Sequence, residues 1–362
     1  MPTRIDAIVV GAGAMGSSTA WWLARRGRRV VLLEQFGAGH SRGSSHGGSR
    51  IFRFAYPDPT YVRMAQAALP LWRELEDDAG RILLETTGAV DHGDAASVGP
   101  TVAALAACGA AYELLSTAEA AERWPHMRTE GQVLFHPDGG RCLADATVAA
   151  LHERAAFHGA DVRFDTGPAA VAADGNGVRV VVGDEELRAP VAVLTAGAWL
   201  PSIAGANLGL RALTVTAEQV QHFRQRDAIS GASWPSFIHH RRPWVYGLFT
   251  PGEGMKVAEH HVGPIVDPDR RDDRLDRSVA AAMGRYVAEW FPGLDPDPLR
   301  LARCLYTTTA TEDFVLDRIG PLVIGSPCSG HGFKFTPLIG RLLADLATGG
   351  PRPDARFRLT RR

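Results

Sequence analysis

The chain has 362 residues, of which 45% are hydrophobic and 22% are charged. These proportions are ordinary for a soluble globular protein and exclude an intrinsically disordered chain. The formal net charge of −1 excludes a strong long-range field that would attract nucleic acid or an anionic membrane surface. The length predicts two domains or one enlarged α/β domain.

The first forty residues are the most informative part of the chain. An apolar strand is predicted over residues 5–10, and a segment with helical spacing follows as far as residue 27. A second apolar strand is predicted over residues 29–33. This order of strand, helix and strand is typical of the first half of a dinucleotide-binding domain.

Three glycines, Gly11, Gly13 and Gly16, form the pattern GxGxxG between the first strand and the helix. In such a unit the first glycine permits a tight turn, the second lets the backbone approach a pyrophosphate, and the third allows helix and strand to pack closely. The helix N-terminus adds unpaired N–H groups and a positive dipole end for the phosphates. Glu34 ends the second strand, where it can accept hydrogen bonds from ribose hydroxyls and would repel the 2′-phosphate of NADP. The pattern predicts an adenine dinucleotide and does not separate FAD from NAD.

The following segment does not continue as an NAD-binding unit would, with a second helix and a third parallel strand. A polar loop covers residues 37–50, and a helix is predicted over residues 59–75 with a kink at Pro70. Strands are expected within residues 82–93 and a helix over residues 102–115.

The middle of the chain predicts a β-hairpin and a buried strand. The hairpin turn is placed at Asp174, Gly175, Asn176 and Gly177, which are residue types that tight hairpin turns prefer. The apolar strand is expected over residues 191–199.

The last part of the chain predicts short strands with few helices. One helix is expected over residues 277–291, a strand over residues 321–325, and a final apolar helix over residues 338–347. No internal repeat or low-complexity linker separates these segments, so we expect two interleaved domains.

The four cysteines, Cys108, Cys142, Cys304 and Cys328, show no CxxC pair, so no metal site and no disulfide scaffold is expected. A strand is predicted almost at the start of the chain, which leaves no room for a signal peptide. The longest stretch without charge, residues 189–210, contains prolines and glycines and is expected to be a buried strand and loop, not a membrane span. We therefore expect a cytoplasmic protein.

Lysine is rare in this chain. Among 39 basic residues only Lys256 and Lys334 are lysines. A protein that uses arginine for surface charge can retain a lysine where a compact, deprotonatable ammonium is needed. For either lysine taken alone, chance retention in an arginine-rich composition is an equally good explanation.

Six blocks of sequence, taken together, carry a family resemblance. In chain order they read VVGAGAMGSS, HGGSRIFRFAY, VLTAGAW, GMKVAEH, CLYTTTATEDFVLD and SGHGFKF. They resemble the monomeric sarcosine oxidase and N-methyltryptophan oxidase family, flavoproteins of the D-amino-acid oxidase type, over nearly the whole chain. The resemblance implies a mixed α/β fold in which a Rossmann-type FAD-binding domain is interleaved with an antiparallel-sheet substrate domain. The first domain would comprise residues 1–85, 140–215 and 307–362, and the second residues 86–139 and 216–306.

The resemblance implies bound FAD, attached covalently through Cys304. Such a linkage needs a nucleophilic thiolate, and strand alternation turns the neighbouring Arg303 away from it. From the residues alone, a buried structural cysteine is the commoner fate of a free thiol. The residues implied to contact FAD are Gly11, Gly13, Gly16, Glu34, Ser49, Val171, Gly197, Trp199, Cys304, Gly330, Gly332, Phe333 and Lys334.

The substrates implied by the resemblance are secondary amino acids, either sarcosine-like N-methyl or cyclic. Arg53 and Lys334 would hold the substrate carboxylate, the guanidinium in bidentate fashion and the ammonium as a point charge, with Tyr246 in the same pocket. The residues themselves leave two orientations open for Lys334, because Phe333 and Phe335 flank it: its side chain faces a cavity, or it reaches solvent.

In the implied reaction, the carbon next to nitrogen delivers a hydride equivalent to flavin N5, oxygen is reduced to hydrogen peroxide, and the imine product hydrolyses. Lys256 would lie near N5, where a fixed positive charge stabilises negative charge that develops on oxygen. The other residues implied in catalysis are Arg50, His46, His260 and Tyr306. The partners would be a small amino acid and molecular oxygen, and the enzyme would be a monomer.

One segment departs from the family. Residues 237–249, FIHHRRPWVYGLF, are more basic and aromatic than expected, and an aromatic cavity position of the family falls near Val245. An amine or imine oxidase of secondary metabolism with a larger substrate therefore stays open, as does a flavin dehydrogenase of the same fold. An NAD-linked reductase is disfavoured by the middle of the chain and the Cys304 block. A flavin-binding protein without turnover is disfavoured by the joint presence of Arg53, Lys256 and Lys334.

Overall fold

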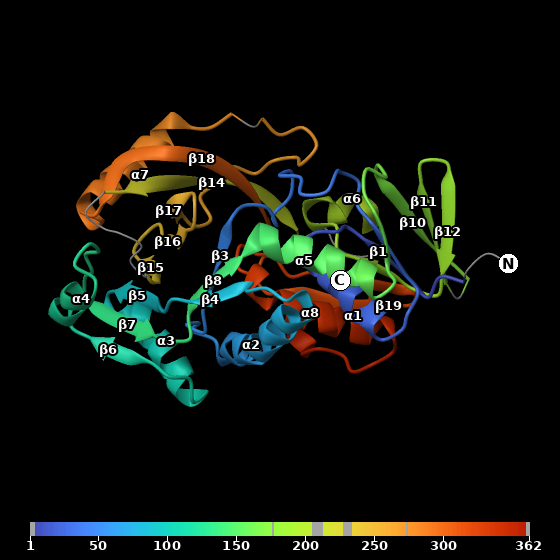
Figure 1. Cartoon of the computed structure of the whole chain (residues 1–362), viewed down its shortest axis with the longest axis horizontal. Helices are drawn as coiled ribbons and strands as arrows, with labels where there is room; N and C mark the ends of the chain where they lie inside the picture. The colour runs from blue at the N-terminus through green and yellow to red at the C-terminus, as the bar shows by residue number, and fades with distance from the viewer. Residues whose placement is uncertain (1–3, 176, 205–212, 227–233, 273, 360–362) are drawn as a thin grey trace.

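The computed structural model describes residues 4–175, 177–204, 213–226, 234–272 and 274–359. Figure 1 shows a parallel sheet with its helices on one side of the molecule and a large curved sheet on the other. The parallel sheet has the strand order β19-β20-β13-β1-β2-β9, and all neighbours are parallel except β19 and β20. Its strands are β1 (Ala7–Val10), β2 (Val30–Leu33), β9 (Asp161–Arg163), β13 (Ala192–Leu194), β19 (Val315–Ile319) and β20 (Leu322–Ser326).

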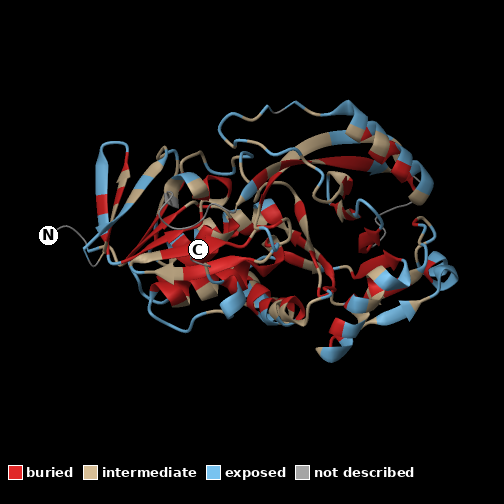
Figure 2. Cartoon of the chain, turned by 180° about the vertical axis from the view of Figure 1, so that it is seen from behind, coloured by how far each residue is buried: buried red, intermediate tan, exposed pale blue. Residues whose placement is uncertain are grey.

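Each face of the parallel sheet is covered by a different layer. Because side chains alternate along a strand, Ala7 and Val9 of β1 pack toward helices, whereas Ile8 and Val10 pack toward a three-stranded antiparallel sheet. The helices are α1 (Ala14–Arg25), α5 (Ala144–Phe157) and α8 (Thr336–Ala347), and the small sheet consists of β10 (Ala169–Asp174), β11 (Gly177–Val182) and β12 (Glu185–Ala189). Burial is greatest in the central strands, and the outer strands of the small sheet are exposed (Figure 2). The parallel sheet and its helices are those of a Rossmann-type unit in which a small antiparallel sheet replaces the helices of one face.

The large sheet has eight strands in the order β18-β14-β17-β16-β15-β5-β7-β6. Neighbouring strands are antiparallel except β15 and β5, which are parallel. The strands are β5 (Ala89–Gly93), β6 (Glu113–Leu115), β7 (Gln132–His136), β14 (Thr214–Gln225), β15 (Ser236–His240), β16 (Val245–Thr250), β17 (Gly254–Glu259) and β18 (Leu294–Thr308). The mixed α/β fold, with a Rossmann-type unit beside a largely antiparallel sheet, is confirmed.

A fourth sheet, with three strands, lies next to the large one. Its strands β3 (Ser49–Phe52), β8 (Gly140–Leu143) and β4 (Leu84–Thr86) pair in the order β3-β8-β4. The remaining helical elements are α2 (Pro59–Ala79), α3 (Ala95–Ala107), α4 (Thr117–Arg123), α6 (Leu200–Ala204), α7 (Arg277–Trp290), η1 (Gly197–Trp199), η3 (Phe333–Phe335) and η4 (Ala355–Phe357).

Several predicted elements differ from the observed ones. The helix predicted over residues 102–115 is α3, which begins earlier because the Asp94 side chain accepts the Ser97 N–H at 2.8 Å as an N-cap, and Gly109 follows its end at a φ of 63°. Residues 113–115 of that prediction form β6, which pairs with β7. The helix with Pro70 runs unbroken to Ala79.

The predicted strand over residues 191–199 is correct only at its start. Its strand part is β13, and the chain then enters η1, where Gly197 has a φ of 53°. The strand is short because a left-handed glycine cannot continue a β-ladder. The hairpin is confirmed by the pairing of Asp174 with Gly177, and Asn176 in its turn lies outside the described residues.

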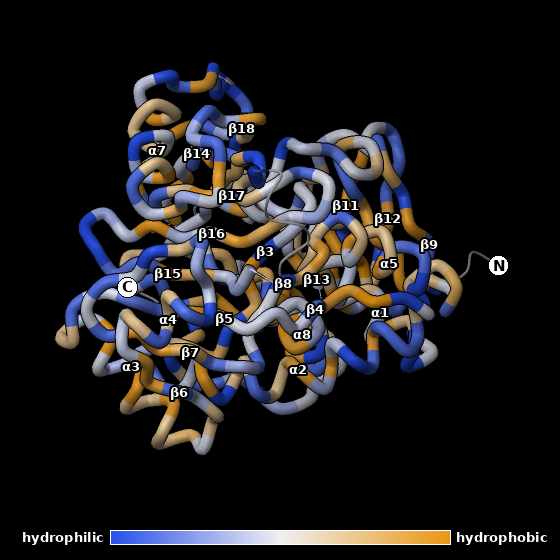
Figure 3. The backbone as a smooth tube through the Cα atoms, turned by 60° about the vertical axis from the view of Figure 1, so that its left-hand side comes forward, coloured by the Kyte–Doolittle hydropathy of each residue, from blue (hydrophilic) through white to orange (hydrophobic). Residues whose placement is uncertain are grey.

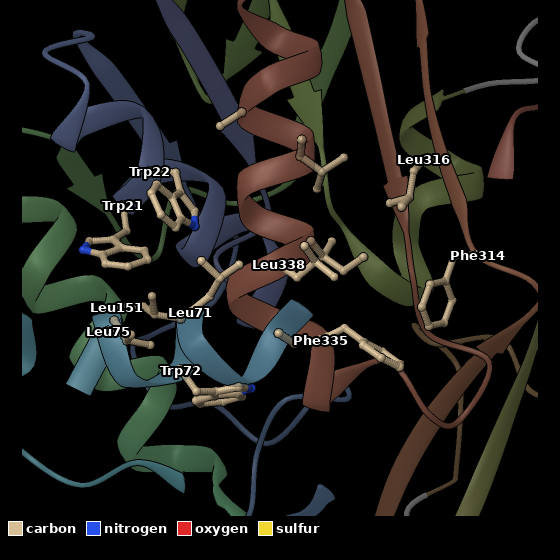
Figure 4. Close-up of a cluster of buried hydrophobic side chains, with 14 of the residues drawn as sticks. Trp21, Trp22, Leu71, Trp72, Leu75, Leu151, Phe314, Leu316, Phe335 and Leu338 are labelled. Carbon is tan, nitrogen blue, oxygen red and sulfur yellow. The ribbon is translucent and has the colours of Figure 1, made fainter. Parts of the chain in front are cut away.

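A cluster of large buried side chains joins the helices to the loop that precedes α8 (Figure 4). Trp21 of α1, Trp72 of α2 and Phe335 of η3 are all fully buried in this cluster. The Trp72 indole N–H also donates to the Lys334 carbonyl oxygen at 2.8 Å. Burial of each such side chain is worth about 1.5–3 kcal/mol, so the backbone around Lys334 is held firmly. Figure 3 shows hydrophobic backbone stretches around α1, α8 and β13, in the part of the molecule that contains the parallel sheet.

Candidate active site

A cavity of about 740 Å³ is lined by residues of the parallel sheet, the large sheet and β3. This volume lies in the range of about 300–1,000 Å³ that is typical of small-molecule sites. Most site residues predicted from the sequence line it: Gly11, Gly13, Glu34, His46, Ser49, Arg50, Arg53, Gly197, Trp199, Tyr246, Lys256, His260, Cys304, Tyr306, Gly330, Gly332, Phe333 and Lys334. Two predicted cofactor residues, Gly16 and Val171, do not line it.

The glycine-rich turn forms one end of the cavity and has little room for side chains. Gly11 has a φ of 98°, and a Cβ added there would lie 2.7 Å from the Thr195 carbonyl oxygen. A Cβ on Gly16 would lie 1.9 Å from the Gly11 carbonyl oxygen, so this glycine serves the close approach of α1 to the turn and does not face the cavity. The close packing brings the start of α1 to the cavity, which Gly13, Ala14 and Met15 line. A helix N-terminus in this position suits a pyrophosphate.

Glu34 is buried at the end of β2 and lines the same end of the cavity. Burial by itself would raise the pKa of Glu34, but hydrogen bonds from His40 and from the Ala12 N–H at 2.9 Å lower it below the usual value. The side chain is therefore an anion that both fixes the turn and offers acceptor capacity to a ribose. The glycine turn, the helix N-terminus and this carboxylate fit the adenosine diphosphate part of FAD.

Cys304 lies on β18 and faces the cavity beside Arg50 of β3. The Arg50 Nη2 atom lies 3.7 Å from the Cys304 sulfur and also donates to the carbonyl oxygens of Ser44 at 3.0 Å and His46 at 2.6 Å. Arg303, the sequence neighbour, instead donates to the Arg274 carbonyl oxygen. The cation that can stabilise a thiolate here comes from a different strand.

Lys256 lies on β17, on the face of the large sheet that borders the cavity. Its Nζ donates to the Ser49 carbonyl oxygen at 2.7 Å, and only 5% of its surface is exposed. Burial, followed by repulsion from Arg50, lowers the pKa of Lys256 to about 7. The ammonium is thus poised to hold or lose a proton near neutral pH.

Lys334 and Arg53 approach a common aromatic ring. Lys334 Nζ lies 5.3 Å and the Arg53 guanidinium carbon 4.7 Å from the centroid of the Tyr56 ring. Lys334 Nζ donates to the Tyr56 hydroxyl at 2.8 Å and to the His331 carbonyl oxygen at 2.7 Å. Burial and the charge of Arg53 hold the pKa of Lys334 well below its usual value. Of the two orientations left open by the sequence, the lysine faces the cavity, and Phe335 packs into the core.

Polar aromatic side chains form the wall next to these cations. The Tyr306 hydroxyl lies 3.4 Å from both the Tyr246 hydroxyl and the His260 Nδ1 atom. Burial and the adjacent His261 lower the pKa of His260 to about 3, so its ring is neutral at physiological pH. Gly330 must be small because a Cβ there would lie 2.5 Å from the Tyr306 ring.

His46 occupies the part of the cavity next to Arg50. Burial, then the charges of Arg50 and Lys256, lower the pKa of His46 to about 4. Its buried Nε2 atom has no hydrogen-bond partner in the described part of the chain. An orphaned polar atom of this kind beside Cys304 and Arg50 fits a ligand with hydrogen-bonding ring edges, as a flavin has.

Val171 and Val245 lie away from the cavity. Val171 is on β10, where it packs against the apolar face of the parallel sheet, while Ala169 of the same strand lines the cavity. Val245 is fully buried on the α7 side of the large sheet, and strand alternation places Tyr246 on the cavity side instead.

Some cavity residues were not predicted from the sequence. Ser45 accepts the Ala14 N–H at 3.0 Å at the start of α1, and its place in the glycine- and serine-rich loop was the only available signal. Trp244 lines the cavity with 39% of its surface exposed, and its ring plane is within 11° of the His260 ring plane at a centroid distance of 6.4 Å. Tyr56, which does not line the cavity but accepts from Lys334, belongs to the block HGGSRIFRFAY that was recognised in the sequence.

The described residues contain neither a metal-binding cluster nor a helix that could span a membrane. No group of three or more His, Cys, Asp or Glu side chains there is arranged to hold a metal ion. None of the helices within the described ranges is long and apolar enough to cross a membrane.

Comparisons with known proteins agree over nearly the whole chain. Residues 6–346 match the family described as DAO, FAD dependent oxidoreductase. The chain is 34% identical to peroxisomal sarcosine oxidase of Homo sapiens, over 94% of this chain and 92% of that protein. It is 32% identical to monomeric sarcosine oxidase of Streptomyces avermitilis, over 97% and 95% of the two chains. The structure is similar to the open form of NikD, described as an unusual amino acid oxidase essential for nikkomycin biosynthesis, with a TM-score of 0.88, 28% identity and 98% of each chain covered.

Proposed function

The chain belongs to the FAD dependent oxidoreductase family, and from this premise we propose how its cavity serves an FAD-dependent amino acid oxidase. The single observation that carries the proposal is that one cavity is lined both by the glycine turn with Glu34 and by the Arg53–Lys334 pair. The first pair of features suits the dinucleotide, and the second suits a substrate carboxylate.

FAD, when bound, supplies the redox chemistry by accepting two electrons and hydrogen from the amine C–H bond and passing the electrons to an acceptor. We propose that Gly11, Gly13 and Glu34 hold its adenosine diphosphate part and that Cys304 attaches it covalently. Arg50 supports this attachment because its guanidinium lies next to the Cys304 sulfur and can stabilise the thiolate.

The substrate would bind as a secondary amino acid with its carboxylate between Arg53 and Lys334. A guanidinium binds the carboxylate in bidentate fashion, and the ammonium adds a point charge from a second direction, so the reacting carbon is oriented. His260, Tyr306 and Tyr246 form the neighbouring wall. The His260 ring is neutral, so it can accept a hydrogen bond from the substrate ammonium, but a pKa of about 3 makes it too weak a base to remove the proton.

Lys256 would supply the charge that oxygen chemistry needs. Its Nζ, anchored on the Ser49 carbonyl oxygen, holds a proton below a pH of about 7 and offers a positive charge toward the cavity. We propose oxygen as the electron acceptor and hydrogen peroxide as the product on this ground. A dehydrogenase of the same fold is the alternative, and reduced enzyme that reoxidises slowly in air would favour it.

A larger substrate than sarcosine is favoured by the aromatic residue at the cavity wall. Trp244 faces the cavity near His260, whereas Val245 is turned toward α7, so the wall is built differently from the expected sarcosine-oxidase pattern. We propose an N-substituted or cyclic amino acid that can contact the indole. Monomeric state and cytoplasmic location stay predictions.

The division into two domains is also a proposal. Every strand of the parallel sheet falls within residues 1–85, 140–215 or 307–362. The large sheet, apart from the first residues of β14 and the last of β18, falls within residues 86–139 and 216–306.

A peroxide-coupled assay tests the function. Purified protein is screened with sarcosine, N-methylated aromatic amino acids, proline and pipecolate, and the expected result is peroxide formation that is faster with the larger or cyclic substrates. Arg53→Met serves as the comparison variant, and it should lose most of the turnover. If no substrate yields peroxide, and substrate bleaches the flavin without oxygen consumption, the proposed oxidase function is refuted. The dehydrogenase function then takes its place.

A further inference from the structure

A buried carboxylate lies behind the substrate-binding arginine. Asp91 is on β5, which pairs in parallel with β15 in the register Asp91 to Ile238. Alternation along these strands turns Val90 and Phe237 toward α7, and it turns Asp91, Ile238 and His240 toward the opposite face, where Ile238 lines the cavity. Asp91 itself is 0% exposed and is not part of the cavity wall.

Asp91 connects a histidine to Arg53. Its Oδ1 atom accepts the His240 Nε2–H at 2.8 Å and lies 3.4 Å from Arg53 Nη1. His240 can come this close because its strand neighbour is Gly93, where a Cβ would lie 2.7 Å from the His240 carbonyl oxygen. The edge of the Trp244 ring packs on His240 at a centroid distance of 5.0 Å.

The carboxylate is ionised in spite of its burial. Burial alone would raise the pKa of Asp91, but the His240 hydrogen bond and the positive charge of Arg53 lower it below the usual value. His136, on the adjacent strand β7, adds a smaller effect in the same direction. A charged carboxylate that is completely buried is maintained only when its partners are held in place.

Arg53 is fixed from one side and free on the other. Both hydrogen bonds found for it in the described part of the chain use Nη1, one to the Ala55 carbonyl oxygen and one to Asp91, and its guanidinium lies over the Tyr56 ring. The remaining N–H groups can therefore address a ligand in the cavity. A long arginine side chain without such partners would have to be ordered by the ligand at a cost in conformational entropy.

We propose that Asp91, supported by His240, is a positioning residue that orients the Arg53 guanidinium toward the carboxylate of the substrate. This inference rests on the proposed function, in which Arg53 binds that carboxylate. Asp91 touches neither substrate nor cofactor and acts only through Arg53. Carboxylate recognition by this cavity then depends on a dyad of the large sheet that contacts Arg53 at Nη1 and leaves its other N–H groups to the ligand.

Ligand titrations of the holoenzyme test the inference. The dissociation constant of propionate is measured from the change in flavin absorbance, and that of uncharged propionamide serves as a reference. Asp91→Ala should weaken propionate binding about tenfold and leave propionamide unchanged. Asp91→Asn should restore affinity to within about threefold of the wild type, because the amide oxygen can still accept from Arg53 and His240.

A double-mutant cycle and a matched control separate positioning from general stability. In an Arg53→Met background, Asp91→Ala should produce no further loss of propionate affinity. His239→Asn is the control, because His239 adjoins His240 but contacts Tyr286 and Glu130 on the α7 side of the sheet. It should lower the melting temperature without changing propionate affinity.

The outcomes distinguish this inference from the function on which it rests. Unchanged or tighter propionate binding by Asp91→Ala, or an equal loss in the Arg53→Met background, overturns the positioning role. Unchanged propionate binding by Arg53→Met overturns the proposed carboxylate site instead. If Asp91→Ala yields no folded holoenzyme, His240→Leu removes the histidine donor to Oδ1 and leaves Arg53 and Asp91 in place. It should weaken propionate binding about threefold, and no weakening would equally refute the role.

Discussion

Replacement of Lys334 by methionine should cost most of the affinity for the substrate carboxylate. Lys334 is 4% exposed, and in the described residues its ammonium donates only to the Tyr56 hydroxyl and the His331 carbonyl oxygen, so no side-chain anion there offsets its charge. A carboxylate at about 4 Å would gain about 4 kcal/mol at an effective dielectric constant of about 20. Desolvation of the carboxylate offsets part of this gain, and hydrogen bonds to charged groups are worth about 1.5–3 kcal/mol. We expect a loss of about 2 kcal/mol, or about thirtyfold in the dissociation constant of propionate.

The same lysine should make carboxylate binding depend on pH. Burial and Arg53 hold the pKa of Lys334 well below its usual value, so the free enzyme loses this proton at lower pH than an exposed lysine would. A bound carboxylate favours the charged form and raises the pKa, so binding takes up a proton in the pH range between the two values. Affinity should be constant below the pKa of the free enzyme and should fall by about tenfold per pH unit above it.

Propionate is the suitable probe for this experiment because it has no amine that titrates in the same range. Its dissociation constant is followed by flavin absorbance from about pH 6 to about pH 10, and Lys334→Met should remove the pH dependence along with the affinity. The titration is repeated in Lys256→Met, because Lys256 also titrates in the cavity. A dissociation constant of the wild type that does not change over this range would refute the reasoning.

Three further predictions concern the cofactor end of the cavity. Lys256→Met should slow reoxidation of the reduced enzyme by oxygen about a hundredfold, a magnitude typical of losing one preorganised charge. The wild-type rate should fall as pH rises through about 7, where Lys256 loses its proton. Stopped-flow rates of the variant equal to those of the wild type would contradict this role. Cys304→Ser should release FAD into the supernatant on acid precipitation, whereas the wild-type pellet stays yellow, and a colourless wild-type pellet would disprove the covalent link. Gly16→Ala places a Cβ 1.9 Å from the Gly11 carbonyl oxygen and should cost about 1–3 kcal/mol of stability and most of the bound FAD. Gly99→Ala, at a helical site where a Cβ meets no atom beyond its chain neighbours, is the control for that change and should leave the flavin content unaltered.

Local patterns were sufficient for the dinucleotide half of the cavity. The strand, the glycine turn, the helix and Glu34 follow one another within the first 34 residues, so the groups that meet in space are also close in sequence. Alternation and helical spacing likewise predicted α1, α7 and α8 to within a few residues. The helix predicted over residues 102–115 was wrong at its end, because residues 113–115 pair with β7 as a strand of the large sheet.

Tertiary structure decided which charges meet. The sequence placed Arg303 next to Cys304, but the guanidinium that reaches the sulfur belongs to Arg50, 254 positions away. The partner of Arg53 is Asp91, which no motif marked, because its role depends on a parallel pairing of β5 with β15.

For the two lysines, too, the sequence determined one part of the result and the tertiary structure the other. Their rarity and their surroundings in the blocks GMKVAEH and SGHGFKF could be recognised in the sequence alone, and these pointed to a role at the cofactor and the substrate. The sequence could not show whether the Lys334 side chain faces a cavity or solvent, because flanking phenylalanines are compatible with either orientation. The fold settled it by packing Phe335 into the core and bonding the Lys334 backbone to Trp72, which leaves the ammonium no direction except the cavity. Short-range periodicity determines which residues form an element, but the direction and charge state of a buried side chain depend on neighbours that only the assembled sheets and helices bring close.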